Sequence, residues 1–155
     1  MRQNQKWIIC LVMGTFSALL LTSGVYAACT VSTTSINFGS YDFLSSAADT
    51  GTGHITLSCS PQANVTIAIG VSLNSGGFYP RMMQHDVSGD TLDYNLYTSA
   101  AMMQVWGDGT HGTATVDFRN VKKSNSPIIV YGKIVPLQNV PAGSYSEPLI
   151  VTITY

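Results

Sequence analysis

The chain has 155 residues, of which 45% are hydrophobic and only 10% are charged, with seven basic and eight acidic side chains. This length provides one domain with a single two-layer core, so the chain has room for one functional module. The slight acidic excess argues against nucleic acid as a partner, because phosphate binding requires a basic face.

The N-terminal segment has the three parts of a secretory signal peptide. Two basic residues precede an apolar run at residues 7–21, and the sequence VYA then supplies small residues at the positions that the signal peptidase reads. We predict cleavage after Ala27, so that residues 1–27 are a signal peptide and residues 28–155 form one mature domain. After cleavage we expect no stable membrane insertion and a secreted protein.

Two other interpretations of this segment fit the residues less well. A membrane-spanning helix needs roughly 20 apolar residues, whereas the apolar run ends at the polar residues 22–24. A lipid anchor would use Cys29, but Tyr26 stands at the position where a lipoprotein signal carries leucine.

The cysteines predict one disulfide. Cys10 lies in the predicted signal peptide, so the mature chain keeps Cys29 and Cys59, an even pair in an exported protein. A bond between them would stabilise the fold by about 3 to 4 kcal/mol on the chain-entropy model. We expect no metal site, because the mature chain has no other cysteine and only three scattered histidines. It keeps five basic and eight acidic side chains, a net charge of −3, which again disfavours nucleic acid.

Alternating apolar residues predict strands along almost the whole mature chain, separated by turn-rich pieces such as DTGTG and PAGSY. No helical stripe longer than two turns and no internal repeat is present. We therefore predict an all-β fold, an antiparallel β-sandwich of immunoglobulin-like type in which the disulfide ties the first strand to the second. The predicted strands lie in residues 29–39, 54–59, 64–73, 91–98, 113–118, 127–135 and 148–155.

Four consecutive stretches carry a family resemblance: CTVSTTSINFGSYDFLS, GHITLSCS, LDYNLYTSAAMMQVWGDGTHGTATV and VYGKIVPLQNVPAGSYSEPLIVTITY. In order and spacing they resemble the spore coat protein U domain, the subunit family of archaic chaperone/usher pili, over nearly all of the mature chain. The resemblance implies an incomplete immunoglobulin-like fold and secretion through a periplasmic chaperone and an outer-membrane usher. It also implies assembly with other pilin subunits into thin surface fibres used for adhesion and biofilm formation.

The last predicted strand, residues 148–155, indicates why such a fold would need a partner. Leu149, Val151, Ile153 and Tyr155 point to one face, at an edge that we expect no later strand to cover. A missing strand would bury about four side chains, each contributing roughly 1.5 to 3 kcal/mol. The free energy lost with that strand is therefore comparable with the whole stability of a domain, about 5 to 15 kcal/mol. We therefore expect this edge to accept a strand from a chaperone or from another subunit.

The predicted cleavage site suggests a position within the fibre. Shaft subunits of the family carry an extension before the first cysteine and donate it to a neighbour, whereas here only Ala28 would precede Cys29. In a head-to-tail polymer a receiver without a donor strand occupies the distal tip, although tip adhesins of this family usually have two domains. The alternative is a stand-alone secreted spore-coat or extracellular-matrix protein, closed by its own chain or by self-association.

The side chains that could carry chemistry are scattered, so we expect no enzyme activity, no catalytic residue and no cofactor. His54, His85 and His111 lie far apart, and the aspartates in residues 86–93 lack the spacing of a calcium-binding EF-hand loop. The Gly-rich stretch that begins at Trp106 predicts a tight hairpin, with the indole in the core, because a phosphate-binding loop would need a helix after it.

Two segments carry apolar side chains that could bind an external surface. Methionine and aromatic side chains in exposed loops are adaptable and apolar, and could grip an abiotic or host surface. Alternatively, they plug the open ends of the sandwich. These candidate adhesive residues, in or beside predicted loops, are Phe78, Tyr79, Met82, Met83, Met102 and Met103.

Overall fold

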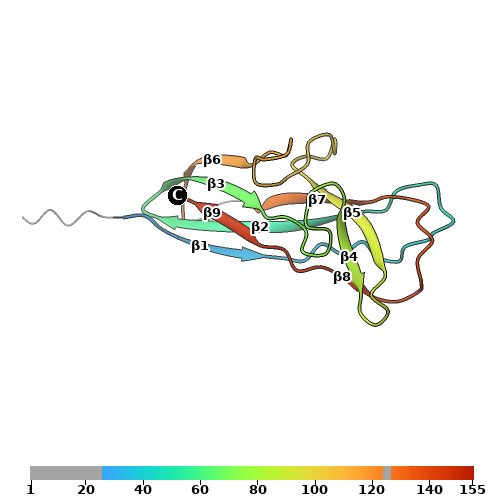
Figure 1. Ribbon diagram of the computed structural model, residues 1–155. Helices are drawn as coiled ribbons and strands as arrows, with labels where there is room; N and C mark the ends of the chain where they lie inside the picture. Colours follow the sequence, from blue (N-terminus) through green and yellow to red (C-terminus); the bar gives the residue numbers. More distant parts are fainter. Residues whose placement is uncertain (1–25, 124–126) are drawn as a thin grey trace, which may run out of the picture.

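The computed structural model describes residues 26–123 and 127–155, which form a β-sandwich with no helix among them (Figure 1). Almost all of the predicted signal peptide lies outside the described residues. Within the described ranges, no helix has the length and apolar character needed to cross a membrane. The strands are β1 (Ala28–Thr33), β2 (Thr50–Ser60), β3 (Ala63–Ile69), β4 (Arg81–His85), β5 (Thr91–Tyr97), β6 (Val116–Val121), β7 (Ile128–Ile134), β8 (Tyr145–Ser146) and β9 (Val151–Thr154).

The strands form two sheets. One sheet has six strands in the order β1-β2-β7-β5-β4-β8, and the other has three in the order β6-β3-β9. All paired strands are antiparallel, which confirms the predicted class of fold. Alternate residues of the central strands are buried between the sheets, as in β2, where Ile55, Leu57 and Cys59 are each 2% exposed.

The first strand is attached to the sandwich by the predicted disulfide. Cys29 of β1 lies directly opposite Cys59 of β2, and the two sulfurs are bonded. The side chains of β1 are otherwise mostly exposed, so apolar burial contributes little to holding this strand. The disulfide and the ladder to β2 therefore fix the strand at which the described fold begins.

A buried tryptophan joins the two sheets. Trp106 is fully buried, as predicted, and its Nε1–H donates to the carbonyl of Ile67 in β3, at 3.1 Å. The main-chain N–H of Trp106 donates to the carbonyl of Leu96 in β5, at 2.9 Å. Since β3 and β5 belong to different sheets, this residue links the two layers by hydrogen bonds as well as by packing.

Several predicted strand limits were wrong, and turns explain the differences. The strand predicted at residues 64–73 ends at Ile69, because the chain enters a turn after Gly70 and leaves Val71 exposed. The strand predicted at residues 113–118 begins later, at Val116. Thr113 instead closes a turn, in which its N–H and its hydroxyl both donate to the carbonyl of Thr110.

We predict that replacing Cys29 and Cys59 together by serine lowers the free energy of unfolding by about 3 to 4 kcal/mol, because the unfolded chain regains the entropy of an open loop. Denaturant unfolding of the oxidised wild type and of the double variant measures this difference. Reductant should destabilise the wild type by the same amount and leave the double variant unchanged. Equal stability of the two oxidised proteins would contradict the prediction.

Candidate functional site

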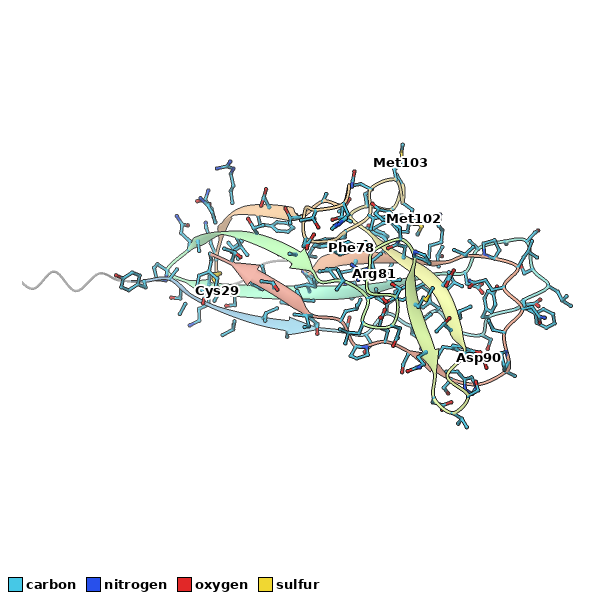
Figure 2. All side chains as sticks on the ribbon, viewed as in Figure 1. Cys29, Phe78, Arg81, Asp90, Met102 and Met103 are labelled. Atoms are coloured by element: carbon cyan, nitrogen blue, oxygen red, sulfur yellow. A yellow bond between two sulfur atoms is a disulfide. The ribbon has the colours of Figure 1, made fainter. Side chains whose placement is uncertain are left out.

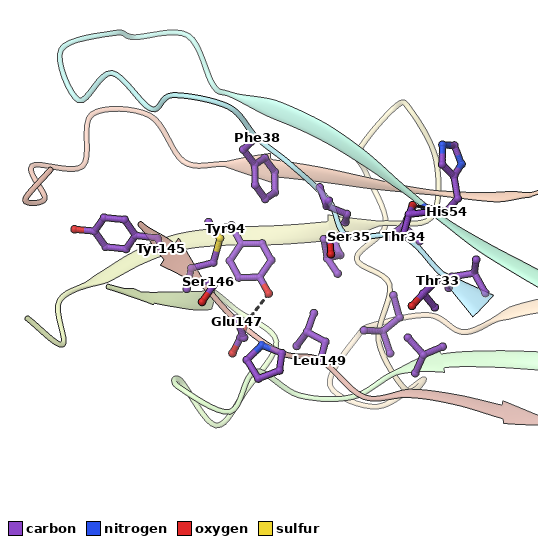
Figure 3. Close-up of a pocket in the computed structure, with 18 residues that line it drawn as sticks. Thr33, Thr34, Ser35, Phe38, His54, Tyr94, Tyr145, Ser146, Glu147 and Leu149 are labelled. Atoms are coloured by element: carbon purple, nitrogen blue, oxygen red, sulfur yellow. Dashed lines mark hydrogen bonds between the residues drawn. The ribbon is translucent and has the colours of Figure 1, made fainter. Parts of the chain in front are cut away.

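A groove opens into the core between two chain segments that flank it (Figure 3). We call residues 33–38, which continue from β1, the first wall, and residues 145–151, which lead into β9, the second wall. The groove has a volume of about 390 Å³. Apolar side chains of both sheets line it, among them Ile55 of β2, Leu96 of β5 and Ile69 of β3.

The first wall leaves the sheet soon after β1 ends. Thr34 makes the last hydrogen bonds with β2: its N–H donates to the carbonyl of His54, and its hydroxyl oxygen accepts the N–H of His54, both at 2.9 Å. Within the described residues, no main-chain hydrogen bond joins residues 35–38 to another strand. Their backbone groups are therefore available to a new partner.

Packing against glycines holds this wall in place. A Cβ atom on Gly53 would lie 2.7 Å from Cγ1 of Ile36, and one on Gly132 would lie 2.6 Å from the ring of Phe38. Only glycine leaves room for the wall to lie this close to β2 and β7. The ring of Phe38 also meets Tyr94 edge to face, with ring centroids 6.1 Å apart.

The second wall crosses from one sheet to the other. Tyr145 and Ser146 form β8, which pairs with β4 in the six-stranded sheet, whereas Val151 opens β9, which pairs with β3 in the three-stranded sheet. The intervening residues 147–150 make the crossover, and Gly70 N–H donates to the carbonyl of Ile150 at 2.8 Å. Because each wall lies at a point where a strand leaves a sheet, the gap between the sheets stays open here.

The predicted acceptor residues lie along the second wall and its continuation. Leu149, Val151 and Ile153 are half-buried against the core, and Ile150 between them is exposed, as the alternation predicted. Leu149 and Val151 line the groove, although Leu149 precedes β9 instead of belonging to it. Ile153 and Tyr155 lie outside the groove lining, and Tyr155 is 58% exposed.

A second hollow of about 920 Å³ continues the groove. It shares Ile36, Phe38 and Met83 with the first, and extends between residues 39–43 and residues 140–144. Together the two hollows form one depression that runs between these segments, a shape suited to another length of chain.

A buried polar cluster stands at one side of the groove, and the sequence analysis missed it. The hydroxyl of Tyr94 donates to Oε2 of Glu147 at 2.5 Å, which Figure 3 shows, and the hydroxyl of Ser72 donates to Oε1 at 2.6 Å. Burial raises the pKa of Tyr94, and its hydrogen bond to Glu147 raises that pKa further. The cluster therefore favours the protonated phenol.

The nearby guanidinium of Arg81 is also fully buried. Its Nη atoms donate to the carbonyl of Gly70, at 2.6 Å, and to that of Trp106, at 3.1 Å. Burial lowers the pKa of Arg81, while Tyr94 and Glu147 act in the opposite direction. A single arginine in a stretch predicted as loop carries no sequence signal for this position, because arginine side chains are mostly exposed.

The candidate adhesive residues divide between the interior and the surface. Phe78 and Met83 are buried, 3% and 8% exposed, which fits the alternative in which such side chains plug the sandwich and leaves them unavailable to an external surface. The guanidinium of Arg81 lies over the Phe78 ring, 5.1 Å from its centroid, and Figure 2 shows the two side by side. The remaining candidates are Met82 in β4, the half-buried Met102, Tyr79 at 56% exposure and Met103 at 88%.

The histidines and acidic side chains do not assemble into a metal-binding set. Among residues 26–123 and 127–155, no three His, Cys, Asp or Glu side chains come close enough together to hold an ion. His85 contacts Asp86, with Nδ1 and Oδ1 3.5 Å apart, and its ring packs against Tyr145. These contacts belong to the hairpin between β4 and β5 and to its neighbour β8.

Comparisons with known proteins agree with this architecture. Residues 15–152 match the family model of the Spore Coat Protein U domain. A protein named "Protein U", from Myxococcus xanthus, is 33% identical over 130 residues, which cover 77% of this chain and 71% of that protein.

A solved structure has a similar fold. It is the crystal structure of a chaperone-tip adhesion subunit pre-assembly complex from archaic chaperone-usher Csu pili of Acinetobacter baumannii. The match has a TM-score of 0.56 and 20% sequence identity, and covers 84% of this chain. This chain spans 40% of the matched chain, so at this identity the likeness concerns the fold alone.

We predict that the stability of the protein falls as the pH rises above about 10, the pKa of an unfolded tyrosine. The folded state keeps the Tyr94 proton that the unfolded chain releases, so the loss approaches about 1.4 kcal/mol per pH unit. Urea unfolding between about pH 9 and 11 should show a shallower fall for Tyr94→Phe than for the wild type. The other tyrosines contribute equally to both proteins, so identical slopes would rule out Tyr94 as the cause.

Proposed function

The chain belongs to the Spore Coat Protein U domain family, and we propose that it is a secreted subunit of a chaperone/usher-assembled surface pilus. Its groove receives a β-strand from another chain, first from a periplasmic chaperone and then from another pilin subunit at the outer-membrane usher. The observation that carries this proposal is the groove itself, which is open to the core between two walls of extended backbone.

A strand suits this groove better than a compact ligand does. Residues 35–38 of the first wall lack main-chain partners among the described residues, and β9 is an edge strand of its sheet. An added strand would bond these backbone groups and place alternate side chains against Leu149 and Val151. It would also remove an open edge, which is an aggregation hazard.

The free energy that a partner strand would contribute is comparable with the stability of a whole domain. About four side chains buried at roughly 1.5 to 3 kcal/mol each would contribute some 6 to 12 kcal/mol, against the 5 to 15 kcal/mol that typically stabilise a domain. Without the strand the fold is marginal, so the chain depends on a chaperone until assembly. The solved structure of similar fold, itself a chaperone-tip adhesion subunit complex, supports this partner class.

Within the fibre we place this subunit at the tip. Ala28 already pairs with Ser60 in β1, so the predicted cleavage after Ala27 leaves no residue to donate to a neighbour. Tyr79 and Met103 are exposed, and the carbonyl of Gly112 accepts hydrogen bonds from the Tyr79 hydroxyl and from the amide of Gln104, the residue after Met103. An apolar surface of this kind would support adhesion and biofilm formation.

A stand-alone secreted coat or matrix protein is the second candidate, and the description of the matched family supports it. Such a protein would be stable without a chaperone, since its own chain or a second copy of it would have to cover the core. The change in stability when a strand is added therefore distinguishes a pilus subunit from a coat protein.

We predict that a strand of alternating valine and threonine, joined after Tyr155 by a flexible linker, makes the mature chain a soluble monomer without a chaperone. By filling the groove it should raise the melting temperature by at least about 10 °C. Periplasmic yield and thermal unfolding measure the effect. The matched control carries the same extension with its valines replaced by serine. If both fusions and the unfused chain are equally stable, the groove is no strand acceptor, and the coat function takes its place.

We predict that pili containing Tyr79→Ser and Met103→Ser assemble normally but bind hydrophobic plastic at least several-fold less well, since both side chains are exposed and outside the core. Crystal-violet staining of attached cells measures binding, and gold labelling of the subunit shows its place on the fibre. Leu73→Ser, another exposed apolar residue, serves as a control. Unchanged attachment would contradict the adhesive role, and label along the whole shaft would contradict the tip position.

A further inference from the structure

We infer that Glu147 is the positioning residue of the groove, whose carboxylate holds the second wall at the spacing that admits a strand. This inference rests on the proposed strand-acceptor function and adds to it the side chain that sets the geometry. It starts from the crossover, where the wall has left β8 and has not yet joined β9.

The crossover is the part of the second wall with the fewest backbone constraints. Ser146 is still paired with Gln84 of β4, and Val151 is paired with Ile69 of β3. Within the described residues, no main-chain hydrogen bond is made by residues 147–149. The position of this stretch, and of the Leu149 side chain that it presents to the groove, must therefore be set by side chains.

Glu147 supplies that constraint by bonding to a strand and to a loop. On one side, Oε2 accepts the hydroxyl of Tyr94, which belongs to β5 in the six-stranded sheet. On the other side, Oε1 accepts the hydroxyl of Ser72 and, at 3.4 Å, the N–H of Asn74, both in the loop between β3 and β4. One carboxylate thus ties the wall to two separate parts of the chain at the point where the wall crosses between the sheets.

The neighbours of Glu147 require an acceptor at this position. Oγ of Ser72 accepts two main-chain N–H groups, from Met82 at 3.1 Å and from Ser75 at 3.2 Å, so its own proton is directed at Glu147. Ser72 is fully buried, so its hydroxyl depends on the Glu147 carboxylate as its acceptor. An acceptor-free side chain at position 147 would leave buried hydroxyls unsatisfied, and the wall would shift to relieve them.

A glutamine retains most of this arrangement, whereas an alanine removes it. The amide oxygen of a glutamine can accept from Ser72, and its NH₂ group can donate to the Tyr94 oxygen, because a phenol both donates and accepts. The geometric role therefore predicts that Glu147→Gln preserves the groove and that Glu147→Ala does not. A role for the negative charge alone predicts that both variants fail.

The test uses the mature, disulfide-bonded chain, refolded from urea in the presence of a fluorescent synthetic peptide of alternating valine and threonine, roughly eight residues long, so that the peptide takes the place of the chaperone's strand. Fluorescence anisotropy gives the dissociation constant of the peptide. We expect Glu147→Gln to bind within about threefold of the wild type and Glu147→Ala to bind at least about tenfold more weakly. Asp117→Ala is the matched control: its carboxylate accepts the Thr66 hydroxyl at 2.6 Å, outside the groove lining, so peptide binding should be unchanged.

The outcomes separate this inference from the proposed function. If the wild type binds no peptide, strand acceptance fails and the role of Glu147 falls with it. If the wild type and Glu147→Ala bind equally well, only the positioning role is overturned, and a loss in Glu147→Gln equal to that in Glu147→Ala overturns it too. If Glu147→Ala does not fold, Tyr94→Phe and Ser72→Ala each remove one bond to the carboxylate. Either should weaken binding by about three- to tenfold, and wild-type affinity in both would refute the inference.

Discussion

Two segments that leave the strand ladders without bonding to each other determine the character of this fold. The first wall makes its last hydrogen bonds to β2 at Thr34, and the second wall crosses between sheets at residues 147–150. Neither segment bonds to the other among the described residues, so the core between them is lined but not covered. Because the two walls leave a gap, other contacts must hold the two sheets together around it.

Hydrogen bonds from buried side chains hold the two sheets together. Trp106 bonds to main-chain groups of β3 and β5. Arg81 donates to the carbonyl of Gly70, just after β3, and to the carbonyl of Trp106. Burying a guanidinium is costly unless its donors are paired. Here the Nη atoms are bonded to carbonyls, and Glu147 stands close enough to offset part of the charge. Trp106 and Arg81 therefore connect the two sheets by hydrogen bonds, in a sandwich whose groove has no closing strand among the described residues.

Much of the sandwich could be predicted from the sequence, because strict alternation identifies a strand with one buried face. This held for β2, β3, β5 and β7, and the even cysteine pair predicted the bond between β1 and β2. β4 was missed because it contains a buried arginine and follows a turn-rich stretch, so its pattern resembled a loop. The cluster around Glu147 joins residues from three distant segments, and its partners become apparent only once the chain is folded.

Under the proposed function, the groove also bears on how the chain would assemble without aggregating. An exposed edge accepts any strand that can bond to it, so selectivity must come from the geometry of the walls. Glycines allow the first wall to lie at close range against β2 and β7, and a carboxylate bonded to β5 and to the loop between β3 and β4 holds the second. Under the proposed function, walls held in this way would favour one register of an added strand, because a strand in any other register would have to displace them. They would also strengthen binding of the correct partner, because less of the chain would have to become ordered on binding.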